Sequence, residues 1–390
     1  MFVIGSIDRL TGFLYATLAV CFGRISFITK YISFDRLTRW HHYHTIPAMT
    51  FIILHFVFLT LSYAQLSRST FWTQQLKFLR FDEILGAYVA LILFLLIAGF
   101  SFLFSFIKIK YEYWYFVHLF VYVAALASFG HQMELGGDFR SLLFSAFWVG
   151  FGLVVLILFV WYRFLAPARL FLHHQFIVNK IIKESDNCYS IYIGGRNIDN
   201  FRYRAGQFAA FRFLTKDFWL QSHPFSISSA PGQKEFRITI KNLGDYTKRL
   251  ITKLKPGTQV IVEGPHGQFV FNDNVKRAVM IAGGIGITPI LSLLGSIKDK
   301  GIETHCFFSI KAQGELIFKD ELSSSGAVVH YHASDDLGRL TLDTIKQSVS
   351  AFRDYHYYIC GHEKMIKFFR DQLMTAGVAK DKIHYELFSY

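Results

Sequence analysis

Residues 111–131 read YEYWYFVHLFVYVAALASFGH, and residues 39–55 read RWHHYHTIPAMTFIILH. Each stretch is an apolar run with a histidine near either end. The histidines concerned are His41, His55, His118 and His131. An imidazole inside an apolar segment is costly unless it has a partner, and haem iron is a common partner. Two helices that each carry an upper and a lower histidine therefore predict two haem irons, one above the other.

The spacing of the histidines indicates how they pair. Fourteen residues separate His41 from His55 and thirteen separate His118 from His131, which corresponds to rises of about 21 Å and about 19.5 Å. Matched levels predict an inner haem held by His41 and His118 and an outer haem held by His55 and His131. Their angular positions match less well, because fourteen helical steps end about 40° from the starting face and thirteen end about 140° from it. Gly130 or local 3₁₀ winding can re-aim His131.

Two further histidines compete for the inner site. His42 lies thirteen residues before His55, and His44 lies eleven residues before it. The eleven-residue spacing keeps His44 and His55 on one face of the helix, but the rise between them does not match the rise between His118 and His131. We expect His41 to be the ligand, with the choice between His41 and His42 left open. His42 and His44 are expected at the membrane interface, near haem propionates.

The composition indicates a membrane protein. Of 390 residues, 52% are apolar and 18% aromatic, with 43 phenylalanines, which exceeds the range of soluble domains. The excess lies before residue 166. Five apolar runs reach the length of about 20 residues that a helix needs to cross a bilayer. These runs are Phe2–Ile25, Arg39–Tyr63, Ile84–Ile107, Tyr113–His131 and Leu142–Tyr162. The first run lacks the basic leader and cleavage site of a signal peptide, so we expect it to be retained.

The basic residues indicate the orientation of the spans. Arg24, Lys30 and Arg36 lie between the first two runs, and Lys108 and Lys110 lie between the third and fourth. The positive-inside rule then places the C-terminal half in the cytoplasm and the N-terminus outside, in an integral protein of the cell (inner) membrane. Basic loops and sites for anionic cofactors also account for the net charge of +13 without nucleic acid, for which no basic stretch with interleaved aromatics is present.

The cysteines exclude several classes of protein. Cys21, Cys188, Cys306 and Cys360 are scattered and form no Cys-x-x-Cys pair. Zinc sites, iron–sulfur clusters and a disulfide framework are therefore not expected.

After a short basic and aromatic linker, Phe164–His174, the pattern changes to strands. The expected strands are His174–Ile182, Cys188–Gly194, Gln207–Phe213 and Glu235–Lys241. Alternation and intervening turn residues favour a small antiparallel β-barrel of about a hundred residues.

Two segments of this region are suited to a flavin. In His223-Pro224-Phe225-Ser226 an aromatic ring can pack on the isoalloxazine while Ser226 hydrogen-bonds its edge. Gly244-Asp245-Tyr246-Thr247 begins a helical pattern, whose exposed amides can hold a pyrophosphate. Either segment alone has an ordinary alternative, which is strand packing for the first and a plain helix cap for the second.

From Arg277 onward, strands alternate with helices. A strand over Ala278–Ala282 leads into Gly283-Gly284-Ile285-Gly286-Ile287-Thr288-Pro289 and then into a helix through Leu294. A glycine-rich turn between a buried strand and a helix is typical of a dinucleotide phosphate site, although the generic Gly-x-Gly-x-x-Gly pattern is only half met. Four more strands are expected at Thr304–Ile310, Ala327–His332, Tyr355–Ile359 and Ile383–Phe388, with a helix at Lys364–Thr375. This order predicts a doubly wound parallel sheet, with Cys360 and Gly361 at a strand end.

The whole chain resembles the ferric reductase/NADPH oxidase family of transmembrane flavocytochromes b, as a bacterial NADPH-oxidase-like member. The motifs that carry the resemblance are the paired histidines at 41/55 and 118/131, His223-Pro224-Phe225-Ser226, Gly244-Asp245-Tyr246-Thr247, Gly264-Pro265-His266-Gly267, Gly283–Pro289, Gly314-Glu315-Leu316-Ile317-Phe318, Cys360-Gly361 and Phe388-Ser389-Tyr390.

The resemblance implies a multi-domain membrane protein with three parts. These are a helical transmembrane haem-binding bundle (1–168), an antiparallel β-barrel that binds FAD (172–273) and a doubly wound α/β nucleotide domain of ferredoxin-reductase type (275–390). The implied cofactors are two haem b, FAD and NAD(P)H. The implied activity moves electrons from cytosolic NAD(P)H to an acceptor outside, with O₂ giving superoxide as first choice and a ferric chelate or a periplasmic protein as alternatives.

The resemblance also implies roles for single residues. Ser226 is expected at the flavin, Cys360 near the nicotinamide, and Tyr390 over the flavin until nicotinamide displaces it. From their place after the second strand of the nucleotide domain, Ser309 and Lys311 are expected to hold a 2′-phosphate and so to favour NADPH.

The chain departs from the family pattern at several positions. It has five predicted spans where the family usually has six, and His266 and His362 replace an aromatic and a proline. Leu59 stands where superoxide-producing members often carry a further histidine, one turn beyond the outer ligand.

Overall fold

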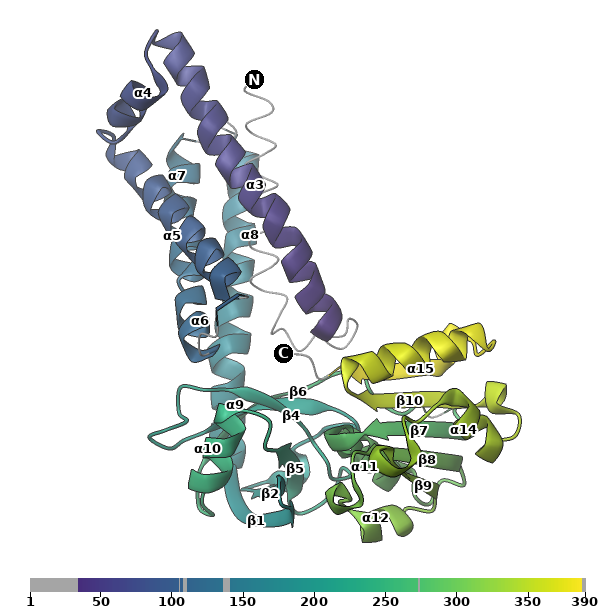
Figure 1. The fold of residues 1–390 in the computed structure, drawn as a ribbon. Helices are drawn as coiled ribbons and strands as arrows, with labels where there is room; N and C mark the ends of the chain where they lie inside the picture. The colour runs from purple at the N-terminus through teal and green to yellow at the C-terminus, as the bar shows by residue number, and fades with distance from the viewer. Residues whose placement is uncertain (1–33, 105, 108–110, 136–140, 273, 388–390) are drawn as a thin grey trace. The chain divides into compact units, whose positions relative to one another are not determined.

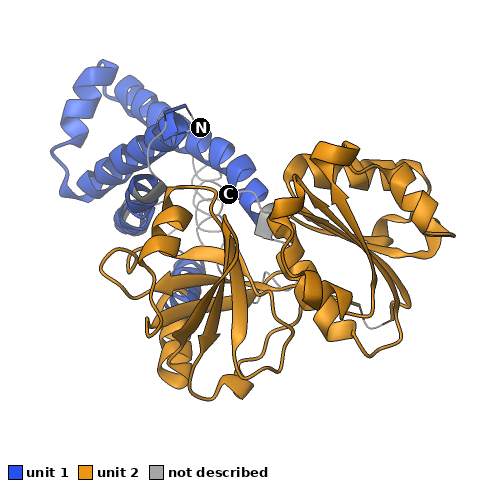
Figure 2. Ribbon diagram, turned by 60° about the horizontal axis from the view of Figure 1, so that its bottom comes forward, with its two compact units in different colours: residues 1–25, 36–162 blue, residues 26–35, 163–390 orange. Residues whose placement is uncertain are grey.

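A computed structural model describes residues 34–104, 106–107, 111–135, 141–272 and 274–387. The chain divides into two compact units, drawn in different colours in Figure 2. The boundary falls between Tyr162 and Arg163. The first expected span, Phe2–Ile25, lies outside the described residues, as does Tyr390.

The described part of the first unit is helical (Figure 1). Its helices are α3 (Phe34–Leu66), α4 (Phe71–Phe78), α5 (Asp82–Phe104), α6 (Tyr111–His118), α7 (Val121–Leu135) and α8 (Leu142–Val160). Within the described residues, four helical stretches are long and apolar enough to cross a membrane, namely Arg36–Leu66, Asp82–Phe104, Tyr113–Met133 and Leu142–His174. They coincide with the second to fifth expected spans.

The fourth expected span is not one uninterrupted α-helix. It breaks directly after His118, where α6 ends, and α7 begins at Val121. At the break the amide of Phe120 donates to the carbonyl of Val117, three residues back, at 3.1 Å. Such 3₁₀ winding advances about 20° more per residue than an α-helix. The break therefore changes the angle about the helix axis between His118 and His131, and it does so in the direction that brings them closer to one face.

Small residues let α5 and α7 approach closely. A Cβ added to Gly86 of α5 would lie 3.0 Å from the carbonyl oxygen of Ala127 in α7. Ala90 of α5 and Ala124 of α7 are buried as well. Close helix approach through small residues is a common way to pack helices within a bilayer, where hydrophobic burial supplies little driving force.

The chain leaves the first unit through a helix. The segment assigned to a linker, Phe164–His174, continues α8 through a π-helical turn, η2 (Trp161–Leu165), into α9 (Ala166–His174). Pro167 lies in the first turn of α9, directly after the π-helical turn. The boundary between the two units lies inside the π-helical turn.

The first part of the second unit is an antiparallel barrel, as predicted. Its strands are β1 (Ile177–Ser185), β2 (Cys188–Gly194), β3 (Phe208–Phe213), β4 (His223–Ser226), β5 (Phe236–Lys241) and β6 (Val260–His266), with the short η3 (Ile198–Asn200) and helix α10 (Asp245–Lys253). They form two sheets of order β1-β2-β5 and β4-β3-β6. Phe176, Phe211, Phe213 and Ile238 are buried in the barrel core.

The second part is a five-stranded parallel sheet of order β11-β10-β7-β8-β9, which confirms the predicted doubly wound fold. Its strands are β7 (Arg277–Gly283), β8 (Glu303–Ile310), β9 (Val328–Ala333), β10 (His356–Gly361) and β11 (Ile383–Leu387). The helices are η4 (Gly284–Gly286), α11 (Ile287–Ile297), η5 (Gln313–Glu315), α12 (Lys319–Ser323), α13 (Ser334–Leu337), α14 (Leu342–Ser348), η6 (Phe352–Asp354), α15 (Glu363–Thr375) and η7 (Lys380–Lys382).

The sheet has a core on each face because successive strand residues point to opposite sides. Met280 and Ala282 pack with α11 on one face, whereas Val279 and Ile281 pack with α14 and α15 on the other.

A pair of histidines lies on the adjacent strands β10 and β11 of this sheet. The Nδ1 of His356 in β10 and the Nε2 of His384 in β11 lie 3.2 Å apart. His384 also stacks on Tyr358 with the ring centroids 4.7 Å apart. Burial, reinforced by the neighbouring His356, lowers the pKa of His384 to about 4, and the opposing effect of Asp381 is smaller.

We predict that this pair makes stability depend on pH. A histidine whose pKa falls from 6.5 when unfolded to about 4 when folded binds more protons in the unfolded state. Stability is therefore lost as the pH falls from about 6.5 towards 4. Over this pH range the His384→Gln variant should lose about 1–2 kcal/mol less unfolding free energy than the wild type, after allowance for solvent screening. The measurement is thermal unfolding of the full chain in detergent between pH 7 and 4.5, and parallel curves for both proteins would contradict it.

Candidate functional site

The inner predicted pair of histidines lies together in the first unit. The ring centroids of His41 in α3 and His118 in α6 are 5.9 Å apart, with an angle of 71° between the rings. Two imidazoles that bind one metal from opposite sides, with bonds of about 2 Å each, place their centroids about 6 Å apart. The separation therefore fits a shared iron.

The competing histidines are placed differently. His42 is exposed, and the Nδ1 of His44 lies 2.6 Å from the carbonyl oxygen of Trp40 in its own helix. This arrangement favours His41 over His42 as the inner ligand. For the outer pair, the Nδ1 atoms of His55 in α3 and His131 in α7 are buried.

Trp114 is a residue of this site that the sequence analysis missed. Its indole stacks on the ring of His118, with the centroids 5.0 Å apart and 25° between the planes. Its Nε1 donates to the hydroxyl of Ser101 in α5 at 3.1 Å. Trp114 thus ties the orientation of His118 to a neighbouring helix. The spacing of four residues between the two rings, which places them on one helix face, was the available signal.

In the second unit, the first flavin motif forms strand β4. His223, Pro224, Phe225 and Ser226 pair antiparallel with β3, and Ser226 is buried. The ring of His223 stacks on Tyr246, with the centroids 3.6 Å apart. The structure therefore brings the two segments predicted to bind the flavin together, because Tyr246 belongs to the second.

The second flavin motif begins helix α10. Gly244 is the N-cap residue, and Asp245 and Tyr246 form the first turn. The hydroxyl of Thr247 accepts hydrogen bonds from the amides of Leu243 and Gly244, at 3.1 Å each. A Cβ added to Gly244 would meet nothing within 4 Å. Open space beside the first turn of a helix fits a pyrophosphate group.

In the nucleotide domain, glycines allow two strand ends to meet. A Cβ on Gly286, at the end of the turn after β7, would lie 2.3 Å from the carbonyl oxygen of Cys360 at the end of β10. A Cβ on Gly361 would lie 3.1 Å from the Cα of Gly283. The chain order reverses between β7 and β10, and ligands of doubly wound folds bind at the carboxyl ends of strands where this reversal occurs.

Other predicted nucleotide residues lie at the same edge of the sheet. Ser309 is opposite Gly283 in the register of β8 and β7, and Lys311 follows directly after β8, where it is exposed. Gly284 has a φ of 52°, which favours glycine. Thr288 and Pro289 lie in the first turn of α11, where the Thr288 hydroxyl donates to the carbonyl of Ile285 at 2.9 Å.

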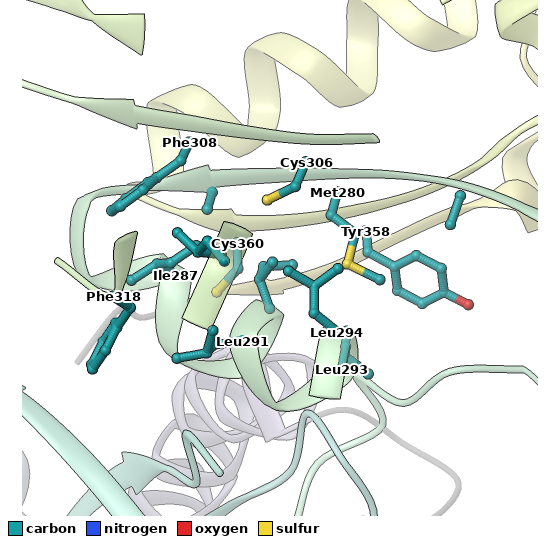
Figure 3. Close-up of a cluster of buried hydrophobic side chains, with 14 of the residues drawn as sticks. Met280, Ile287, Leu291, Leu293, Leu294, Cys306, Phe308, Phe318, Tyr358 and Cys360 are labelled. Atoms are coloured by element: carbon teal, nitrogen blue, oxygen red, sulfur yellow. The ribbon is translucent and has the colours of Figure 1, made fainter. Parts of the chain in front are cut away.

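Cys360 occupies the expected strand end, but its side chain is buried in the core. Figure 3 shows it among the apolar side chains that line α11 and the sheet. Its Sγ donates to the carbonyl oxygen of Glu386 in β11 at 3.7 Å. Burial raises the pKa of the Cys360 thiol well above its ordinary value, so it is a neutral thiol near pH 7.

Known proteins match the chain in three sections. Residues 10–129 match the family of ferric reductase-like transmembrane components, residues 176–273 an FAD-binding domain family and residues 280–371 an oxidoreductase NAD-binding domain family.

Two flavohemoproteins each match 55% of this chain. A flavohemoprotein of Oceanobacillus iheyensis is 25% identical over 238 residues, which cover 55% of this chain and 58% of the relative. Flavohemoprotein A of Dictyostelium discoideum is 28% identical over 239 residues, which cover 55% of this chain and 60% of the relative. The chain thus spans about three-fifths of the length of these relatives. A solved structure, the cytochrome P450 reductase of Amycolatopsis, shares the fold with a TM-score of 0.50 at 16% identity, covering 56% of this chain and 70% of that one.

These modules define an NAD(P)H-dependent flavin oxidoreductase joined to a membrane-embedded helical domain. The order of its membrane, FAD-binding and NAD-binding modules gives the chain the ferric reductase/NADPH oxidase-like architecture.

We predict that Gly286→Ala disrupts the nucleotide edge of the sheet. The added Cβ would clash with the backbone of Cys360, so the strand end must move, at a cost of about 1–3 kcal/mol. We expect a lower unfolding temperature and weaker NADPH binding, measured by calorimetry on the full chain. Gly314→Ala is the control, because a Cβ there meets nothing within 4 Å. Equal stability of the two variants would refute the close-contact argument.

Proposed function

We propose that the chain carries electrons from cytosolic NAD(P)H through FAD and two b-type haems to an acceptor outside the cell membrane. The flavin links the two ends, because it accepts a two-electron hydride and releases electrons singly to haem. The observation that carries the proposal is the 5.9 Å separation of the His41 and His118 rings from two apolar helices. FAD-binding and NAD-binding domains in the same chain supply a route for electrons from NAD(P)H to such a site.

The four membrane histidines have distinct roles in this proposal. His41 and His118 ligate the inner haem, and His55 and His131 ligate the outer one. Trp114 holds the ring of His118 in place. The 3₁₀ break after His118 supports the outer pair, since it rotates the following helix relative to α6.

The soluble residues bind and orient the flavin and the nucleotide. Ser226 and the strand His223–Ser226 hold the isoalloxazine, while the first turn of α10, with Gly244, Asp245, Tyr246 and Thr247, holds the pyrophosphate of FAD. The turn from Gly283 to Pro289, together with Cys360 and Gly361, receives the nicotinamide nucleotide. Tyr390 is proposed to cover the flavin in the absence of nicotinamide.

NADPH is the proposed coenzyme. Ser309 and Lys311 lie at the carboxyl end of β8, beside the glycine-rich turn. A hydroxyl and an exposed ammonium group at this place are suited to a 2′-phosphate.

For the acceptor we propose O₂, which takes one electron to give superoxide. A ferric chelate is the second candidate, because Leu59 replaces the histidine that superoxide-producing members often carry there. A periplasmic protein that takes electrons from the outer haem is the third.

We predict that His→Ala at 41, 55, 118 or 131 each removes about one haem per chain, because ligation by two histidines fails when either is lost. Haem content is read from reduced-minus-oxidised spectra of purified protein. His42→Ala is the matched control, since the exposed neighbour should leave both haems in place. Full haem content in His131→Ala, or haem loss in His42→Ala, would move the ligand elsewhere.

The acceptor prediction is tested with the purified full chain and NADPH. We expect reduction of cytochrome c that superoxide dismutase suppresses. Rapid reduction of a ferric chelate without superoxide would favour the ferric reductase, and slow turnover with both small acceptors would favour a protein partner. Failure of NADPH and NADH to bleach the bound flavin would refute the proposed electron source.

A further inference from the structure

The FAD barrel and the nucleotide sheet meet at the loop that follows β4. The hydroxyl of Ser292 in α11 donates to the carbonyl oxygen of Ser229 at 2.6 Å. Gly295 of α11 faces Ala230, because an added Cβ would lie 3.0 Å from the Cβ of Ala230. The loop after the flavin strand is therefore bonded to the helix that starts at the glycine-rich nucleotide turn.

Arg237 of β5 lies beside the same loop, with only 5% of its side chain exposed. Its Nε donates to the hydroxyl of Ser228 at 3.1 Å, and its Nη2 donates to the Ser228 carbonyl at 3.2 Å. Ser228 lies two residues after Ser226. One edge of the guanidinium is thus bound to the end of the flavin strand.

The other edge of the guanidinium reaches the nucleotide domain. Nη1 and Nη2 donate to the two carboxylate oxygens of Glu321 in α12, at 2.5 Å and 2.8 Å. The guanidinium also lies over the ring of Phe318, 4.5 Å from its centroid. A bidentate pair of this kind fixes orientation as well as distance, because both groups are planar.

The segment that presents Glu321 is anchored in the nucleotide core. Ile317, Phe318 and Leu322 belong to the buried cluster that also contains Leu291 of α11 and Cys360 (Figure 3). A displacement of Glu321 relative to Arg237 therefore moves the cluster that underlies the nucleotide turn, because close-packed cores transmit displacement.

We propose that Arg237 is a positioning residue, which through Ser228 and Glu321 holds the nucleotide domain in register with the flavin strand. This inference rests on the proposed function, in which NAD(P)H gives up a hydride and leaves as NAD(P)⁺, while the oxidised flavin accepts the two electrons and the proton. A displacement of about 1 Å between reacting groups can cost about 10²-fold in rate. Such a displacement would have to break the bonds from Arg237 to Glu321.

The test compares Glu321→Gln with the wild-type full chain in detergent, using NADPH and its 4-deuterated form in anaerobic stopped-flow measurements of flavin bleaching. We expect at least a tenfold slower bleaching that retains a deuterium isotope effect, with the same FAD content and full reduction by dithionite. Arg237→Lys keeps the positive charge but loses the paired hydrogen bonds of the guanidinium, so its flavin should also bleach more slowly. Asp320→Asn is the matched control, since it removes a carboxylate from the adjacent residue of α12, and it should stay within twofold of wild type.

Bleaching of Glu321→Gln and Arg237→Lys at the wild-type rate would overturn the inference. It would also be overturned if Asp320→Asn slowed bleaching as much as these two variants do. Loss of FAD or of the folded state in both variants would overturn it as well, because the residue would then be structural. Wild-type flavin that NADPH and NADH leave oxidised would instead refute the proposed function.

Discussion

A histidine in an apolar helix needs partners for its ring nitrogens, and this constraint organises the described membrane helices. The ring of His118 contacts the rings of His41 and Trp114, and the indole of Trp114 donates to Ser101 of α5. The helix that carries His118 breaks directly after it, which decouples the angular setting of this ring from that of His131. The residue spacing of one continuous α-helix therefore does not give the angle between His118 and His131.

A second constraint acts in the soluble unit, where two backbones must come closer than side chains allow. Gly283, Gly286 and Gly361 let the ends of β7 and β10 touch. The contact shapes the edge of the sheet to which the nucleotide turn belongs. A Cβ on Gly286 would lie 2.3 Å from the carbonyl oxygen of Cys360, so a larger residue at this position requires the backbone to move.

Much of the soluble fold followed from periodicity. Cys188–Gly194 was predicted to the residue, and the five strands of the parallel sheet were predicted within one or two residues. Strand β6 was not predicted, because Gly264 and Pro265 interrupt its pattern, and β4 was recognised as a flavin motif without a definite strand assignment. The continuation of α8 into the expected linker was also missed, since basic and aromatic residues there look like an interface rather than a helix.

Local composition and period are enough to identify the long apolar helices, the barrel strands, the sheet strands, the histidines and the glycine-rich turns, because these features belong to short stretches of the chain. Only the tertiary structure decided which of the inner histidines faces His118, that Cys360 is buried, and that Arg237 meets Glu321, 84 residues away. Contacts of this kind depend on how elements distant along the chain pack together, and no local pattern specifies them.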